Sequence, residues 1–107
     1  VRILKSYVEG AGVNLEFARS MVGIREFSVP VTVFRFGGLS FVTVPGEFYS
    51  TLLMPDTAAI CYANGYYRYI ADQNAYDTGH YEALAAIVAR GSGEILSNTI
   101  RQMLEKL

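Results

Sequence analysis

Two neighbouring segments near the middle of the chain are rich in β-branched and aromatic residues, 29–36 (VPVTVFRF) and 39–44 (LSFVTV). Such residues favour strands. Gly37 and Gly38 separate the segments and predict a tight turn, so we expect an antiparallel hairpin over residues 29–44. Successive positions of a strand point to opposite faces, and here both faces are largely apolar. The hairpin is therefore expected inside a larger sheet that is covered on both sides.

The end of the chain shows the helical period. Apolar residues recur there at helical spacing and form one stripe: Ile95, Leu96, Ile100, Met103, Leu104 and Leu107. The stripe predicts an amphipathic helix over residues 93–106 that packs on the core. Ser92 is a candidate N-cap, and Glu94 adds negative charge to the first turn, where it favours the helix dipole.

The remaining segments give shorter patterns. A small and apolar run predicts a buried strand over residues 57–63, before the turn signal Asn64-Gly65. The other expected segments are the end of a helix at 2–8, an extended segment at 14–27, a short helix at 48–54 and a polar loop at 72–79. Residues 81–89 leave helix and strand both open. Together these elements predict an α+β fold with a mixed sheet.

Composition limits the class of protein. The 107 residues are 51% hydrophobic and 18% charged, with a formal net charge of −1, which is ordinary for one small globular unit. A near-neutral chain has no electrostatic footprint for nucleic acid or an anionic membrane. No apolar run approaches the roughly 20 residues that span a bilayer. We expect no nucleic-acid partner, no transmembrane segment and a soluble protein, with cytoplasm and secretion both open.

The chain has one cysteine and one histidine. Cys61 excludes an intrachain disulfide and a cysteine-based zinc cluster, and its apolar surroundings indicate a small buried hydrophobe. His80 precedes Tyr81 and Glu82. Neighbours on a strand point to opposite faces, so the triplet is not expected to converge on one ion, and we reject His80 as a ligand. Neither a nucleophile elbow nor a phosphate loop is present.

Glu47 departs from the pattern of a plain domain. It follows the second strand directly after the Pro45-Gly46 corner, at a rigid and water-poor edge where a carboxylate is costly unless it is paired or bound to a metal. The alternative is that Glu47 lies in the first turn of a short helix and complements its dipole. Spacing alone favours that alternative.

A cluster of tyrosines follows Glu47. A phenol can donate a hydrogen bond to an oxyanion or ligate a metal, although a place in the core or on a cleft wall is the more frequent role of any single tyrosine. The cluster comprises Tyr62, Tyr66, Tyr67, Tyr69, Tyr76 and Tyr81.

These motifs form an ordered series. The hairpin leads into Pro45-Gly46-Glu47, and the series continues with residues 63–69 (ANGYYRY), Tyr76, Tyr81-Glu82 and residues 91–94 (GSGE). The series resembles the C-terminal part of the catalytic domain of the neutral/alkaline non-lysosomal ceramidase family, over residues 31–107. The resemblance implies that residues 1–107 are a single unit, the C-terminal portion of a larger catalytic domain.

The resemblance implies a zinc-dependent hydrolase that cleaves an N-acyl amide bond, as in sphingolipid and lipid metabolism. In that family two histidines, a glutamate and a tyrosine hold one zinc ion. By motif the glutamate is Glu47, and the tyrosine is Tyr69, the second Tyr of the N-x-Y-x-x-Y pattern, with Tyr66 as the alternative. Tyr81 resembles the residue that stabilises the oxyanion.

The sequence also departs from the family. Both histidine ligands belong to upstream segments of the family, and His80 matches neither, so this chain alone is expected to be incomplete and inactive. It would need the upstream part of the same protein or a homo-oligomer partner. The spacing from Glu47 to Tyr69 is shorter than in the family, so an N-acyl compound other than ceramide is an equal expectation. The competing hypothesis is a non-enzymatic α+β module whose tyrosine-rich surface binds a partner or closes a homo-oligomer.

Overall fold

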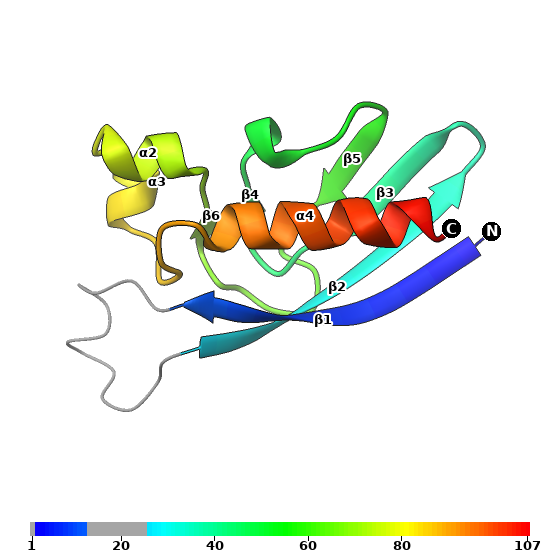
Figure 1. Ribbon diagram of the computed structural model, residues 1–107, viewed down its shortest axis with the longest axis horizontal. Helices are drawn as coiled ribbons and strands as arrows, with labels where there is room; N and C mark the ends of the chain where they lie inside the picture. Colours follow the sequence, from blue (N-terminus) through cyan, green and yellow to red (C-terminus); the bar gives the residue numbers. More distant parts are fainter. Residues whose placement is uncertain (1, 13–25) are drawn as a thin grey trace.

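The protein consists of a twisted sheet with one long helix along one of its faces (Figure 1). The structure is a computed structural model and describes residues 2–12 and 26–107. Its elements are β1 (Arg2–Gly12), β2 (Glu26–Phe36), β3 (Leu39–Thr43), β4 (Glu47–Phe48), the 3-10 helix η1 (Ser50–Leu52), β5 (Thr57–Ile60), β6 (Tyr69–Ile70), α2 (Gln73–Asp77), α3 (Tyr81–Leu84) and α4 (Ser92–Glu105).

The strands form two sheets. The larger has the order β1-β2-β3-β5, and the smaller consists of β4 and β6. β1, β2 and β3 run antiparallel, whereas β5 adds parallel to β3, so the larger sheet is mixed. The predicted hairpin is confirmed: β2 and β3 are joined through Gly37, whose φ of +63° suits glycine. The α+β class, the C-terminal helix and a further strand, β5, are confirmed as well. The prediction that this strand is buried over residues 57–63 is wrong, because β5 ends at Ile60, lies at the edge of the sheet and is half-buried to exposed.

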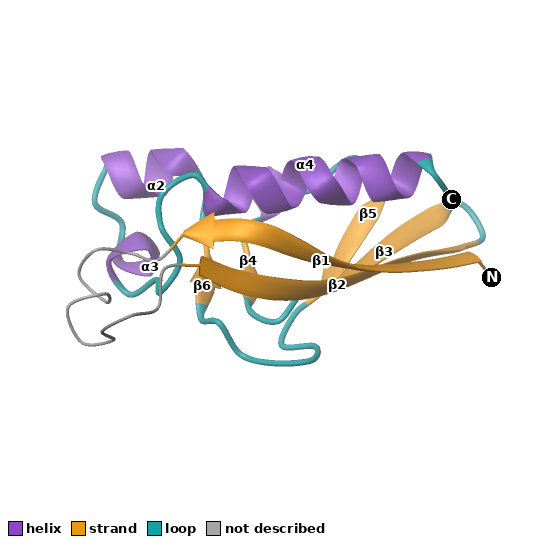
Figure 2. Ribbon diagram, turned by 60° about the horizontal axis from the view of Figure 1, so that its bottom comes forward, coloured by secondary structure: helices purple, strands orange, loops and turns teal. Residues whose placement is uncertain are grey.

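The core lies between the larger sheet and α4, as Figure 2 shows. The valines that alternate along β2 and β3 face the helix: Val29, Val31, Val33 and Val42 are at most 2% exposed. Leu96, Ile100, Met103 and Leu104 of the predicted stripe pack in this core, whereas Ile95 is 43% exposed and lies outside it. Among the residues that the structure describes, no helix is long and apolar enough to cross a membrane.

Arg35 lies on the same face of β2 as Val31 and Val33 and is half-buried. Its guanidinium donates to the carbonyl oxygen of Leu104 at 3.3 Å and to the hydroxyl of Ser40 at 3.2 Å. Leu104 lies in the last turn of α4, where carbonyl groups have no partner within the helix and a cation complements the dipole. Arg35 therefore fastens the end of the helix to the hairpin.

The outer face of the hairpin is less covered than the sequence predicts. Phe34 and Phe41 stack with ring centroids 5.0 Å apart and are half-buried. At the turn end, however, Phe36 is 70% exposed and Leu39 is 42% exposed. The prediction of a sheet covered on both sides is thus wrong at this end of the hairpin, because the apolar stripe of α4 covers only the inner face.

The first strand corrects the expected helix end at residues 2–8. β1 pairs with β2 from Arg2 opposite Arg35 to Gly12 opposite Glu26. The register shifts between Val8 and Ala11, which is the signature of a β-bulge. Gly10 lies within this irregularity. The expected extended segment at 14–27 lies outside the described residues up to 25, and its last two residues belong to β2.

Three shorter expectations also change. Residues 48–54 form the end of β4 and the 3-10 helix η1 in place of one short helix, and residues 73–77 of the expected polar loop form α2. Within residues 81–89 the helix α3 ends at Leu84. The last helix begins at Ser92 with Gly91 as its N-cap.

Candidate functional site at the Glu47 corner

Glu47 is positioned by a tight approach of two backbone segments. Pro45 and Gly46 turn the chain from β3 into β4, and the backbone N–H of Glu47 donates to the carbonyl oxygen of Arg68 at 2.8 Å. Glycine is required at position 46, because the carbonyl of Arg68 occupies the space that a β-carbon would take. The Pro-Gly-Glu motif is therefore explained by packing against the segment that precedes Tyr69.

Glu47 and Tyr69 are direct partners in the smaller sheet. β4 and β6 run parallel, with Glu47 opposite Tyr69 and Phe48 opposite Ile70. Paired residues of neighbouring strands project from the same face. The carboxylate and the phenol, which are far apart in the sequence, thus belong to one surface. The negative charge of Glu47 raises the pKa of Tyr69 above its ordinary value.

The loop between β5 and β6 wraps around the corner. Backbone N–H groups of Ala63 and Tyr67 donate to the carbonyls of Val44 at 3.0 Å and Pro45 at 2.6 Å. Tyr62 and Arg68 in this loop adopt left-handed backbone conformations, with φ of 59° and 57°. Each such residue costs on the order of 1 kcal/mol or more. Strained residues of this kind cluster at functional sites more often than elsewhere.

Tyr62 uses its left-handed conformation to reach Glu47. Its hydroxyl donates a short hydrogen bond to the Oε1 atom of the Glu47 carboxylate. This hydrogen bond raises the pKa of Tyr62 to about 12, because loss of the phenol proton would place two negative charges side by side. The sequence indicated Tyr62 only as a member of the tyrosine cluster, with no role of its own. Its contact with Glu47 depends on the conformation of the loop.

Two further tyrosines border the site. The ring of Tyr81, from α3, packs edge-on against Tyr69 with centroids 6.0 Å apart. Tyr66 stacks on Tyr62 with centroids 5.4 Å apart. The structure thus gathers Glu47, Tyr69 and Tyr81 around one point, while Tyr66, the alternative ligand, lies against Tyr62.

The Glu47 corner is more open than the sequence suggested. Glu47 is half-buried, and the tyrosines around it are exposed to solvent: Tyr62 is 54% exposed and Tyr81 is 69% exposed. The expectation of a water-poor edge is wrong for the part of the chain that the structure describes. Glu47 also lies in a strand and not in a helix, so the helix-dipole alternative is wrong as well.

The donor set fits part of a zinc site. Zinc accepts carboxylate oxygens, and a catalytic zinc commonly takes three protein ligands and one open position. Glu47 and Tyr69 present two oxygen donors from one face, but the described residues contain no group of three His, Cys, Asp or Glu side chains that could hold a metal. His80 is exposed at the start of α3, and Cys61 is half-buried against the core. A complete zinc site at this corner would need ligands beyond these two.

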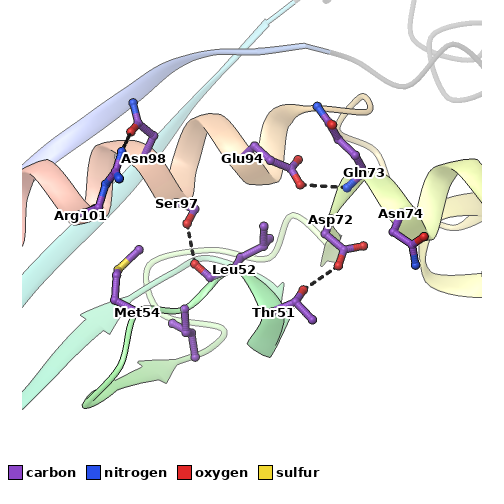
Figure 3. Close-up of a pocket in the computed structure, with 11 residues that line it drawn as sticks. Thr51, Leu52, Met54, Asp72, Gln73, Asn74, Glu94, Ser97, Asn98 and Arg101 are labelled. Carbon is purple, nitrogen blue, oxygen red and sulfur yellow. Dashed lines mark hydrogen bonds between the residues drawn. The ribbon is translucent and has the colours of Figure 1, made fainter.

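A separate groove lies on the other side of β6. It has a volume of about 540 Å³ and runs between η1, the start of α2 and α4 (Figure 3). Its carboxylates already have structural roles: Asp72 accepts from the Ala75 N–H and from Thr51, and Glu94 accepts from the Gln73 N–H at 2.9 Å. These bonds satisfy the N-terminal turn of α2. The groove contains neither Glu47 nor Tyr69 among its lining residues.

Gly93 in the GSGE motif also has a packing explanation. A β-carbon there would collide with the carbonyl of Ala71 and with the Leu52 side chain. The motif therefore allows α4 to start close to β6, and this fixes the strand that carries Tyr69.

Comparison of the chain with protein-family models, with curated proteins and with solved structures finds no match.

Proposed function

We propose that the Glu47 corner is part of the zinc site of a ceramidase-like hydrolase that cleaves an N-acyl amide bond. One observation carries the proposal: Glu47 and Tyr69 are paired on adjacent strands, and the ring of Tyr81 packs against Tyr69. The resemblance of the motif series to the ceramidase family implies roles for these same residues. Their convergence in space is an independent observation that supports those roles.

Each residue has a distinct task in this proposal. The Glu47 carboxylate and the Tyr69 phenol would hold the metal, and their negative charge would offset that of the cation. Tyr81 would donate a hydrogen bond to the amide carbonyl oxygen as charge develops on it. Zinc, when bound, supplies Lewis acidity and lowers the pKa of a bound water toward neutrality. The two histidines implied by the motif resemblance would come from upstream segments of a longer protein.

The rim of the site favours a substrate with an apolar part. Tyr66 and Tyr81 are both more than half exposed beside the candidate ligands. Exposed aromatic rings offer an apolar surface with polar tips, which suits an acyl chain that ends in an amide. We propose an N-acyl amide as the substrate class, with ceramide as one member and shorter N-acyl compounds as others.

The test measures the zinc content of the intact source protein and its amidase activity toward N-acyl substrates. Glu47→Gln and Tyr69→Phe are each expected to reduce zinc occupancy and activity together. Tyr67→Phe is the matched control, because Tyr67 lies in the loop before Tyr69 but its hydroxyl donates to the Ser28 carbonyl of β2 at 3.3 Å. If both site variants keep the zinc and the activity of the wild type, the proposal is refuted.

A second candidate function is a non-enzymatic interaction module. It is favoured by the outer face of the sheet, where Phe36, Leu39 and Ile60 are all more than 40% exposed. Exposed apolar surface of this kind marks interaction sites. The native mass of the source protein separates the candidates: a much longer chain with upstream histidines supports the hydrolase, and a native chain of this length that self-associates supports the module.

A further inference from the structure

The hydrogen bond between Tyr62 and Glu47 joins an exposed phenol to a half-buried carboxylate. Tyr62 follows β5 and is not part of the N-x-Y-x-x-Y pattern, yet its hydroxyl reaches the Oε1 atom of the carboxylate. Because the tyrosine is 54% exposed, water can compete for both groups. The hydrogen bond therefore depends on other contacts that hold the Tyr62 side chain close to Glu47.

The backbone supplies that support. The N–H of Tyr62 donates to the carbonyl of Gly46 at 3.3 Å, and the next residue, Ala63, is bonded to Val44 at 3.0 Å. The left-handed conformation of Tyr62 follows from this attachment. Its ring is held from one side by the stacked ring of Tyr66. The phenol is therefore aimed at Glu47 by contacts that do not involve the hydroxyl itself.

A contribution to folding alone does not explain this arrangement. A left-handed tyrosine is strained, and an exposed hydrogen bond adds little stability in return. Local strain of this kind persists where a fixed side-chain geometry is needed. The carboxylate that Tyr62 fixes is the one paired with Tyr69.

We propose that Tyr62 is a positioning residue that holds the Glu47 carboxylate by one oxygen, so that the other oxygen would be available to a metal. This inference rests on the proposed function, because it concerns the same metal site. Carboxylate ligands of metals are commonly held by a hydrogen bond of this kind, and loss of such a partner typically weakens metal affinity by about 10- to 100-fold. Tyr62 itself does not contact the metal or the substrate.

The test is the zinc affinity of the intact source protein, measured by competition with a chelator. Tyr62→Phe keeps the ring and its stacking on Tyr66 but removes the donor, so zinc is expected to bind about 10- to 100-fold more weakly. Tyr67 lies in the same loop as Tyr62, but its hydroxyl is bonded to Ser28 of β2, so Tyr67→Phe is expected to bind zinc as the wild type does. In the cobalt-substituted protein, the visible absorption bands should change in Tyr62→Phe and stay unchanged in Tyr67→Phe.

The outcomes separate the two proposals. If the wild type binds zinc, Glu47→Gln loses it and Tyr62→Phe binds with wild-type affinity, the role of Tyr62 is refuted and the metal site stands. A wild type without zinc affinity overturns both proposals. If Tyr62→Phe fails to fold while Tyr67→Phe folds, the hydroxyl is a structural group and the positioning role is refuted.

Discussion

The carbonyl oxygen of Arg68 lies 2.5 Å from the position that a β-carbon on Gly46 would take. The same carbonyl accepts the N–H of Glu47, so the contact sets the distance between β4 and β6 as well as the direction of the chain. A side chain at position 46 would have to push this backbone away. The pairing of Glu47 with Tyr69 therefore depends on a glycine one residue before the carboxylate.

Gly46→Ala is expected to destabilise the protein by about 1–3 kcal/mol, the usual cost of overpacking. The reason is that the neighbouring atom is the backbone carbonyl of Arg68, which yields less readily than the end of a side chain. Urea unfolding of the chain measures the effect. Gly38→Ala is the matched control, since no atom lies within 4 Å of its β-carbon position, and a change of less than about 0.5 kcal/mol is expected. Equal stability of the two variants would contradict the packing account of the motif.

Arg35→Ala is expected to cost about 1–2 kcal/mol of unfolding free energy, because it removes the donor from the Leu104 carbonyl at the end of α4. Arg90→Ala serves as the comparison. Arg90 pairs with Asp77 at 2.8 Å, but both side chains are about half exposed, and exposed ion pairs contribute between about 0 and 1 kcal/mol. Denaturation of both variants should rank Arg35 first, and the opposite ranking would refute its fastening role.

Local and distant interactions explain which elements the sequence predicted. The hairpin was predicted because its turn and its alternating valines, such as Val31 and Val33, lie within one short segment. β1 was missed because its strand character depends on pairing with β2 across the residues between them. The helix α2 was missed because Glu94, far along the chain, accepts the N–H of Gln73 in its first turn. Sequence spacing carries no information on such partners.

In the candidate site too, the sequence indicated individual residues but not their distant partners. Motif order named Glu47, Tyr69 and Tyr81, but it did not indicate that β4 and β6 would pair or that Tyr81 would contact Tyr69. Tyr62 had no distinguishing spacing within the tyrosine cluster. Its contact with Glu47 depends on a left-handed backbone conformation with a φ of 59°. Tyrosine rarely adopts this conformation, so the sequence does not predict it.

Alkaline titration provides a test of the Tyr62–Glu47 bond. Tyr62 and the partly buried Tyr76 have pKa values raised from 10.0 to about 12, by the bond to Glu47 and by burial respectively. Since the folded state keeps these protons while the unfolded chain releases them near pH 10, their contribution to stability is present below pH 10 and is lost as the pH rises toward 12. Absorbance of tyrosinate near 295 nm follows the titration.

Glu47→Gln distinguishes the two phenols in that titration. It removes the charge beside Tyr62, so the pKa of Tyr62 should fall toward 10, whereas the pKa of Tyr76 depends first on burial and should stay near 12. Tyr62→Phe and Tyr76→Phe assign the two late transitions. If Glu47→Gln leaves the whole titration curve unchanged, the carboxylate does not interact with Tyr62 in solution.

Zinc titration of this chain alone tests whether the Glu47 corner is complete. Glu47 and Tyr69 present two oxygen donors, and two ligands do not close a zinc site that normally needs three or four from the protein. Isothermal calorimetry is therefore expected to show no tight stoichiometric binding, and Glu47→Gln should give the same trace as the wild type. Submicromolar binding that Glu47→Gln abolishes would contradict the need for upstream ligands, since the described residues would then suffice to hold the metal by themselves.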